Sequence, residues 1–239
     1  LNVGALGEAG VNLKGRTDTQ KIIAETWASP GYTPGPIQPG EWTLQVDVFR
    51  VLPPGGVTYR VEVAFSEEPG EGLAPPAAAP VAERGPGWYR GDLHGHTDHS
   101  DGRWGVADFV AYQKARGLDF AFLTDHNTVS GIPHARALAD DDFLLAPGVE
   151  VTTFWGHCLS LGTDVWVDWC IREGETMEAR AKAIMARGET YIIAHPMAPG
   201  HPWCSGCQWQ YGEMFPGPAR LVEVWNSDWA VEAPKNELG

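Results

Sequence analysis

Residues 91–97 read Gly-Asp-Leu-His-Gly-His-Thr, and this short stretch decides how the rest of the chain is interpreted. We predict that it forms a strand on which Asp92, His94 and His96, spaced by two, project from the same face. Two imidazoles on one face can converge on a single metal ion. A His-x-His pair also occurs by chance on a polar surface strand, so the surrounding sequence has to decide between these two interpretations.

Acidic residues and histidines also follow other predicted strands. The apolar run 120–124 is followed directly by Asp125 and His126, and the run 191–194 by His195. Loops beyond the strand ends of α/β domains carry function, so these side chains are expected to converge. The candidate metal ligands are His94, His96, Asp101, His126, Glu150, His157 and His195, and the candidate catalytic residues are Asp101 and His126.

Each candidate also has a plain structural explanation when taken singly. Asp101 fits a turn, His126 a cap, Glu150 a solvated strand end and His195 a hydrogen-bonded core histidine. Five strand ends that all deliver such residues favour a metal site instead. Imidazole and carboxylate ligands suit Zn, Mn or Fe, and a glutamate can bridge two ions through its two oxygens.

The pattern of elements predicts two domains. Residues 1–86 contain alternating segments at 42–49 and 57–65, which predict a small β-sandwich-like domain, and a Pro- and Ala-rich linker at 67–86. Residues 87–239 alternate strands with helices, which predicts an α/β domain that carries the candidate metal ligands. Beyond 91–97, its strands are expected at 120–124, 144–145, 149–153, 158–161, 191–194 and 221–225, and its helices at 106–116 and 176–187.

Composition narrows the classes of partner. The 239 residues carry a net charge of −14, which argues against nucleic acid as a binding partner. The sequence has no apolar run of about 18 residues, the length that a membrane-spanning helix needs. We therefore expect a soluble protein with a small-molecule ester substrate, and we leave its oligomeric state open. The chain begins at Leu1 without a visible leader, so it is processed, trimmed or a fragment, and the compartment is cytoplasmic or exported.

Cys204 and Cys207 form a Cys-x-x-Cys pair that has three interpretations. It is half of a separate metal site, a redox pair or disulfide, or plain loop packing. A structural zinc site needs four ligands, and the sequence has no second such pair. The three interpretations stay open at the level of sequence.

The motifs Gly-Asp-Leu-His-Gly-His-Thr, Ser-Asp-Gly, Leu-Thr-Asp-His-Asn, Gly-Val-Glu, Gly-His and Ala-His-Pro, in that order, resemble the PHP (polymerase and histidinol phosphatase) superfamily. The resemblance covers about residues 88–226. The preceding sheet domain, with Pro34-Gly35-Pro36 and Gly40-Glu41-Trp42, resembles the CehA/McbA-like metallohydrolase branch, named for carbamate hydrolysis. The resemblance implies a distorted (β/α)7 barrel with two or three divalent metal ions.

The same resemblance implies a role for each ligand: His94 and His96 would hold one ion, Glu150 would bridge to a second held by His157 and His195, Asp101 with His126 would serve a third, and Asp125 would support the ligands. The superfamily usually supplies a further Asp-x-His after the strand at 221–225, but Asp228 lacks the histidine and the chain ends at Gly239. Either the chain is truncated or the site lacks two ligands.

The expected activity is hydrolysis by a metal-activated water that attacks a phosphoester, or a carbamate or ester bond. The alternative is a non-catalytic accessory module that binds metal or ligand with an incomplete site.

Overall fold

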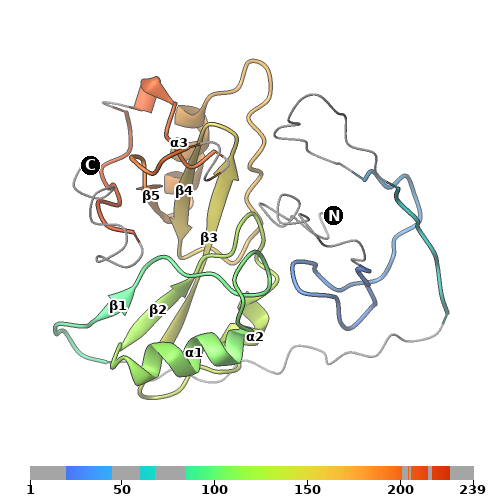
Figure 1. The fold of residues 1–239 in the computed structure, drawn as a ribbon, viewed down its shortest axis with the longest axis horizontal. Helices are drawn as coiled ribbons and strands as arrows, with labels where there is room; N and C mark the ends of the chain where they lie inside the picture. The colour runs from blue at the N-terminus through green and yellow to red at the C-terminus, as the bar shows by residue number, and fades with distance from the viewer. Residues whose placement is uncertain are drawn as a thin grey trace.

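The structure is a computed structural model that describes residues 20–44, 60–67, 84–200, 204, 206–214 and 217–226. Within these described ranges, five strands and three α-helices follow one another (Figure 1). They are β1 (Gly91–Asp92), α1 (Val106–Ala115), β2 (Phe120–Leu123), α2 (Ile132–Arg136), β3 (Leu144–Thr153), β4 (Gly156–Leu161), α3 (Met177–Ala186) and β5 (Thr190–Ala194), with a short 3-10 helix, η2, at Gly212–Met214.

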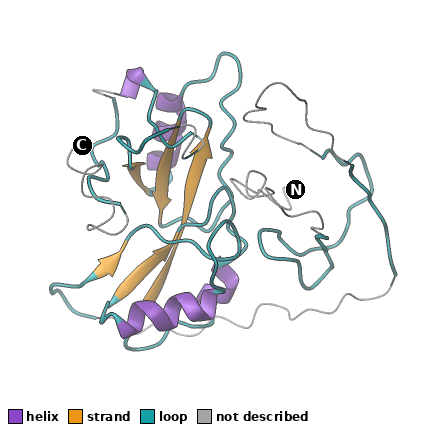
Figure 2. Cartoon of the chain, viewed as in Figure 1, coloured by secondary structure: helices purple, strands orange, loops and turns teal. Residues whose placement is uncertain are grey.

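The five strands form one mixed sheet in the order β1-β2-β3-β4-β5. The pairs from β1 to β3 are parallel, and the pairs from β3 to β5 are antiparallel. The change happens within β3, where Pro147 is the last partner of β2 and Gly148 is the first partner of β4. Strand β3 is therefore the element that joins the two halves of the sheet (Figure 2).

The two faces of the sheet have different neighbours because side chains alternate along each strand. One face packs against the helices: Leu123 and Leu145 lie in a core cluster with residues of α1 and α2, and Val149 and Val151 lie in a cluster with residues of α3. The other face carries a smaller cluster made of Leu159, Leu161, Ile192, Ala194 and Phe122. Glu150 alternates with Val149 and Val151, so it points away from the helices.

Most of the elements predicted after residue 88 are confirmed. Helices 106–116 and 176–187 are present within one residue at each end, and α3 begins at a cap in which the Thr176 hydroxyl accepts a hydrogen bond from the N–H of Ala179 (3.1 Å). The short helix α2 was not predicted. The strand predicted at 91–97 stops at Asp92, and the one at 221–225 is reduced to a single parallel bridge between Ile193 and Val222.

The described residues contain part of each of the two predicted domains. The described residues form an α/β fold with a mixed sheet, while the distorted (β/α)7 barrel stays a prediction. Of the strands predicted for the β-sandwich-like domain, the structure describes residues 42–44 and 60–65, which form no strand, and the rest lies outside the described residues. The boundary near residue 86 also stays a prediction.

Among the described residues, no helix has the length and apolar character needed to cross a lipid bilayer.

Candidate metal centre

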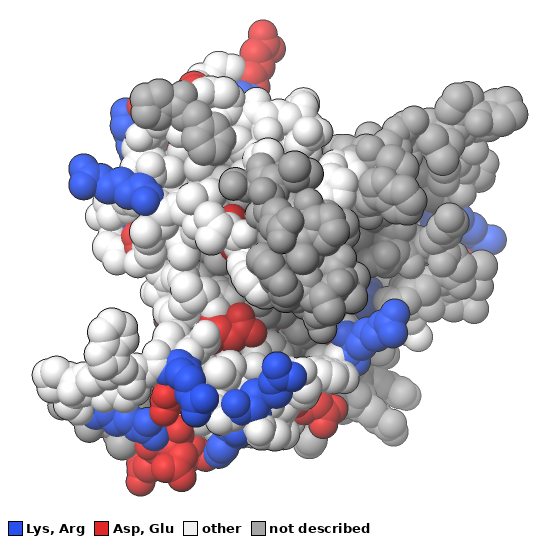
Figure 3. All heavy atoms as spheres, turned by 60° about the vertical axis from the view of Figure 1, so that its left-hand side comes forward, with Lys and Arg blue, Asp and Glu red and all other residues white. Residues whose placement is uncertain are grey.

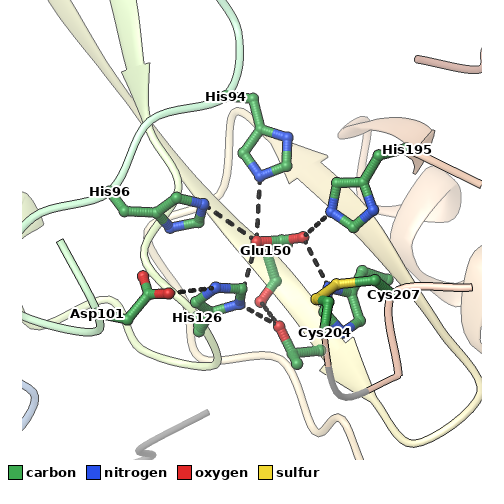
Figure 4. The surroundings of a disulfide bond; sticks show 10 residues. His94, His96, Asp101, His126, Glu150, His195, Cys204 and Cys207 are labelled. Carbon is green, nitrogen blue, oxygen red and sulfur yellow. Dashed lines mark hydrogen bonds and ion pairs between the residues drawn. A yellow bond between two sulfur atoms is a disulfide. The ribbon is translucent and has the colours of Figure 1, made fainter. Parts of the chain in front are cut away.

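A buried carboxylate lies at the centre of the predicted site. Glu150 is fully buried, and its two oxygens face different groups of histidines (Figure 4). Oε2 lies 3.1 Å from His94 Nε2, 3.2 Å from His96 Nε2 and 3.0 Å from His126 Nδ1. Oε1 lies 3.1 Å from His157 Nδ1 and 3.0 Å from His195 Nε2. The structure thus brings five predicted histidines around one carboxylate.

His94 and His96 reach Glu150 although the strand ends before them. The backbone of Gly95, between them, still pairs with Thr124, whose N–H donates to the Gly95 carbonyl (2.9 Å) and whose hydroxyl accepts from the Gly95 N–H (2.9 Å). This pairing keeps the β1–β2 register, three residues beyond the pair formed by Asp92 and Ala121. Both imidazoles are therefore held toward the same side, as the spacing predicts.

His126 is placed by the residue that follows it. Asn127 has φ 53°, in the left-handed region, and its N–H donates to the carbonyl of Glu150 (2.9 Å). The Asn127 side chain also binds the backbone of Thr152 in both directions, at 2.8 and 2.9 Å. Such a fixed turn at the end of β2 clamps His126 against β3, next to Glu150.

His157 and His195 come from the antiparallel half. His157 lies in β4 on the same sheet face as Thr152, its partner in β3, and its side chain is fully buried. His195 directly follows β5 and has φ 28°, a conformation that a non-glycine residue adopts at an energetic cost. Local strain of this kind often marks a residue whose side chain is held for function.

Asp101 completes the cluster from the loop after β1. Its Oδ2 lies 3.6 Å from His126 Nε2, and its side chain is 25% exposed, the most open in the cluster. The loop packs tightly, since a Cβ at Gly102 would lie 2.6 Å from the carbonyl of His96. Asp125 fixes the same loop by accepting hydrogen bonds from Thr97 (2.7 Å) and from Ser100 (2.6 Å). Asp125 thus contacts the loop rather than the histidines.

The donor set fits a divalent metal ion. Three histidine nitrogens lie within 3.2 Å of Glu150 Oε2, yet none is aligned as a hydrogen-bond donor to that buried oxygen. The buried Nδ1 atoms of His96 and His195 also lack a hydrogen-bond partner among the described residues. Nitrogen and oxygen atoms that crowd together without pairing are expected where an ion completes their coordination. His94, His96 and Glu150 form one such group, His96, Asp101 and His126 a second, and His126, Glu150 and His157 a third.

The charges in the cluster are strongly coupled. Burial raises the pKa of Glu150, but the neighbouring His126 and His94 outweigh burial and hold this pKa well below its usual range. Burial lowers the pKa of His94, but the attraction of the Glu150 carboxylate outweighs burial and raises it to about 10. For His157 burial dominates and lowers the pKa. The Glu150 carboxylate therefore stays ionised in its buried position because of the neighbouring imidazoles.

Glu223 is a residue of the site that sequence analysis missed. Its carboxylate contacts His94 Nδ1 at 3.1 Å and accepts a hydrogen bond from the backbone N–H of His195 at 2.9 Å. A carboxylate on the second nitrogen of a ligand imidazole fixes the orientation and tautomer of that ring. The signal available in the sequence was its place in the segment predicted as the strand at 221–225, which pairs next to β5.

Asp92 behaves differently from the prediction that it shares a face with His94 and His96. Its Oδ2 accepts a hydrogen bond from Gln113 Nε2 of α1 (2.8 Å), and its Oδ1 accepts one from the N–H of His94 (3.1 Å). The reason is that β1 ends at Asp92, so strict alternation does not continue from Asp92 to His94. Asp92 supports the start of the motif rather than the centre.

Cys204 and Cys207 are joined in a disulfide, one of the three interpretations left open by the sequence. The disulfide lies beside the centre (Figure 4). Ligand atoms of Cys207, His157 and His195 lie within 4.8 Å of one another. The pair is thus placed against the histidines on the Oε1 side of Glu150.

Comparison with known proteins gave partial matches. No family model matches the chain. It is similar to the 5′-3′ exoribonuclease Rnm of Salmonella typhimurium, with 32% identity over 109 residues, 41% of this chain and 37% of the relative. A 5′-3′ exoribonuclease of Haemophilus influenzae is 37% identical over 65 residues, 27% of this chain and 24% of the relative. The matches thus span 37% and 24% of the length of these two relatives.

A solved structure was also found, a two-domain protein of Bacteroides vulgatus containing a predicted PHP-like metal-dependent phosphoesterase. It superimposes with a TM-score of 0.41 at 20% identity, over 62% of this chain and 49% of that chain.

The expectation of a small-molecule ester substrate without nucleic acid is contradicted by the two relatives, which are both named exoribonucleases. The expectation rested on the net charge of −14, which is a sum over the whole chain. Recognition of a phosphate depends on the local field instead, and divalent ions at the site would reverse its sign. On the face in Figure 3, basic side chains also lie among acidic ones over the lower part of the molecule.

Proposed function

We propose that this chain is a metal-dependent phosphodiesterase of the PHP type that hydrolyses RNA. The observation that carries the proposal is the environment of Glu150, a buried carboxylate with five histidines at 3.0 to 3.2 Å and one oxygen without a hydrogen-bond donor. The RNA substrate is supported by the names of the two relatives. The CehA/McbA-like branch and the identity of the metal, Zn, Mn or Fe, stay predictions.

The proposed ligand assignment follows the two oxygens of Glu150. His94 and His96 would hold one ion at Oε2, and His157 and His195 would hold a second at Oε1, so Glu150 would bridge them. Asp101 and His126 would serve a third position, which gives two or three ions. Ions of this kind lower the pKa of a bound water toward neutrality and stabilise charge that develops on phosphate oxygens.

Asp101 is a proposed catalytic residue because its side chain is the most exposed of the cluster, and His126 is the second because its ring contacts Asp101. Burial raises the pKa of Asp101, but its hydrogen bond and attraction to His126 outweigh this and lower it, so the group is a carboxylate at neutral pH. A carboxylate there can accept a hydrogen bond from the attacking water and orient it. In the two-ion form, in which no third ion binds His126, its Nε2, 3.6 Å from Asp101 Oδ2, could deliver a proton to the leaving oxygen.

The direct test is hydrolysis of a short 5′-phosphorylated RNA by protein that has been stripped with a chelator and then titrated with Mn²⁺ or Zn²⁺. We expect activity to return with about two or three ions per chain. Turnover in the continued presence of chelator would contradict the scheme. Full metal binding without hydrolysis of RNA or of a generic phosphodiester would favour the metal-binding accessory module instead.

A matched pair of variants controls for folding. Glu150→Gln changes the buried carboxylate, and Glu178→Gln makes the same change on the exposed face of α3, where Glu178 pairs with Lys182 at 2.6 Å. Glu150→Gln should abolish hydrolysis, and Glu178→Gln should leave it unchanged.

A further inference from the structure

The loop that carries Cys204 and Cys207 is held over the centre by contacts other than the disulfide. The N–H of Trp209 donates to the carbonyl of Pro196 (3.2 Å), and the N–H of Gln210 donates to the carbonyl of Trp155 (2.7 Å). The ring of Trp209 also packs on Gly156, where a Cβ would lie 2.5 Å from its Cε3. The segment that follows Cys207 is therefore anchored to the turn between β3 and β4 and to the turn after β5, and these contacts do not depend on the disulfide.

Gly206 brings the next residue, Cys207, close to the histidines. A Cβ at Gly206 would lie 2.1 Å from the carbonyl oxygen of Thr153 and 3.3 Å from His157 Nε2, and its φ of 74° is left-handed. Glycine is the residue that tolerates both conditions. The backbone is thus pressed against β3 and β4, which places buried Cys207 next to His157 and His195.

Two observations point to a ligand at this position. One potential ligand atom from each of Cys207, His157 and His195 lies within 4.8 Å of the others. In addition, the buried Nδ1 of His195 has no hydrogen-bond partner among the described residues. Thiolate and imidazole together form a donor set that suits Zn²⁺.

We propose that Cys207 is a redox-controlled metal ligand on the Oε1 side of Glu150. In the disulfide its sulfur is bonded to Cys204 and cannot act as a thiolate, which is the form that binds metals. A dithiol reductant supplies two electrons and two protons, which breaks the S–S bond, leaves two thiols and converts the dithiol to its own disulfide. The Cys207 thiol then loses its proton to solvent as its sulfur binds the ion. This inference rests on the proposed metal centre.

The other cysteines do not compete for this role. Cys158 lies on the opposite sheet face, in the core cluster with α3, and burial raises its pKa to about 12. It therefore stays a thiol at neutral pH. Cys170 is half-buried and lies outside the groups of potential ligands among the described residues.

Cobalt absorption provides the test, because thiolate bound to Co²⁺ gives a near-ultraviolet charge-transfer band that imidazole does not. The oxidised protein and the protein reduced with dithiothreitol, then freed of it without oxygen, are titrated with Co²⁺. We expect the band only in the reduced protein. Zn²⁺ competition against a chelating dye should show binding at least about tenfold tighter after reduction.

Two variants separate the sulfurs. Cys204→Ser leaves Cys207 unable to form the disulfide, so the band should be present with or without reductant. Cys207→Ser should lack it under both conditions. A band that disappears in Cys204→Ser and persists in Cys207→Ser would overturn the assignment, as would identical spectra for reduced wild type and Cys207→Ser.

The same spectra separate this inference from the proposed function. Visible Co²⁺ bands without the near-ultraviolet band would overturn the role of Cys207 and leave the histidine centre intact. No cobalt absorption in any form, with unchanged far-ultraviolet circular dichroism, would overturn the proposed centre itself and the inference with it.

Discussion

The two sides of Glu150 differ in exposure and in donor chemistry. The Asp101 side consists of Oε2 with His94, His96, His126 and Asp101, and the side chains of His96 and Asp101 are 23% and 25% exposed. The Cys207 side consists of Oε1 with His157, His195 and Cys207, where the side chain of His157 is fully buried and that of His195 is 11% exposed. The proposed substrate would therefore reach the centre from the Asp101 side. The Cys207 side is suited to hold an ion and to control its retention.

Replacing the residue shared by both sides should have the largest effect. Glu150→Gln removes the charge that both ions would share, so metal should be lost from the Asp101 side and the Cys207 side together. Hydrolysis should fall on the order of 10³-fold or more. Elemental analysis and initial rates measure the two effects. A variant that keeps its full metal content would show that Glu150 is not a bridge.

A change confined to the Asp101 side should separate activity from metal content. Asp101→Asn is expected to lower the rate of hydrolysis by about 10²- to 10⁴-fold, since it removes a proposed catalytic carboxylate. At least one ion should stay bound on the Cys207 side. Asp98→Asn, an exposed position in the same loop, is the control and should keep its activity. Loss of all metal from Asp101→Asn would mean that the two sides are not independent.

Glu223 contacts residues of both sides, His94 by its side chain and His195 by its backbone. Glu223→Gln keeps an oxygen that can accept from the His195 N–H but removes the charge beside His94. We expect metal affinity to fall by about 10- to 100-fold, measured by competition with a chelating dye. An unchanged affinity would restrict Glu223 to a role in packing.

The smallest expected effect is a difference between the two sides in the number of protons that metal binding releases. In the metal-free protein the pKa of His94 is raised to about 10, so at pH 7 this imidazole is protonated and must lose a proton to bind metal. The pKa of His157 is lowered, so that group binds without release. Binding on the Asp101 side should thus strengthen by up to about tenfold per pH unit below pH 10. Calorimetry of the oxidised protein in buffers of different ionisation enthalpy measures the protons, and His94→Gln should remove this contribution.

Local patterns were sufficient for many of these features. The apolar run before Asp125 and His126 forms β2, as predicted. Glu150 lies in β3, which includes the strand predicted at 149–153, and the alternation of side chains along β3 places its carboxylate on the face away from the helices. Each of these depends on residues close together in the chain. Sequence spacing therefore predicted the seven candidate ligands, which the structure brings into one cluster.

Features that depend on distant segments could not be predicted in the same way. Glu223 meets His94 across 129 residues, and the pairing that brings them together is only one bridge long. The Cys207 loop has no periodic pattern, so its position over β4 follows from tertiary contacts such as Trp209 on Gly156. The substrate expectation was wrong because total charge carries no information about a local site.

Strand β3 has a consequence for folding as well. It pairs in parallel on one edge and antiparallel on the other, and Glu150 lies just beyond the residue where the pairing changes. A slip of one residue in either register would turn Glu150 toward the apolar residues of α3 and expose Val149 or Val151 to the histidines. Burial of an unpaired carboxylate among apolar side chains costs free energy. A sheet with a shifted register is therefore less stable than the native sheet even without a bound ion. Glu150 therefore also favours the correct register of the sheet during folding.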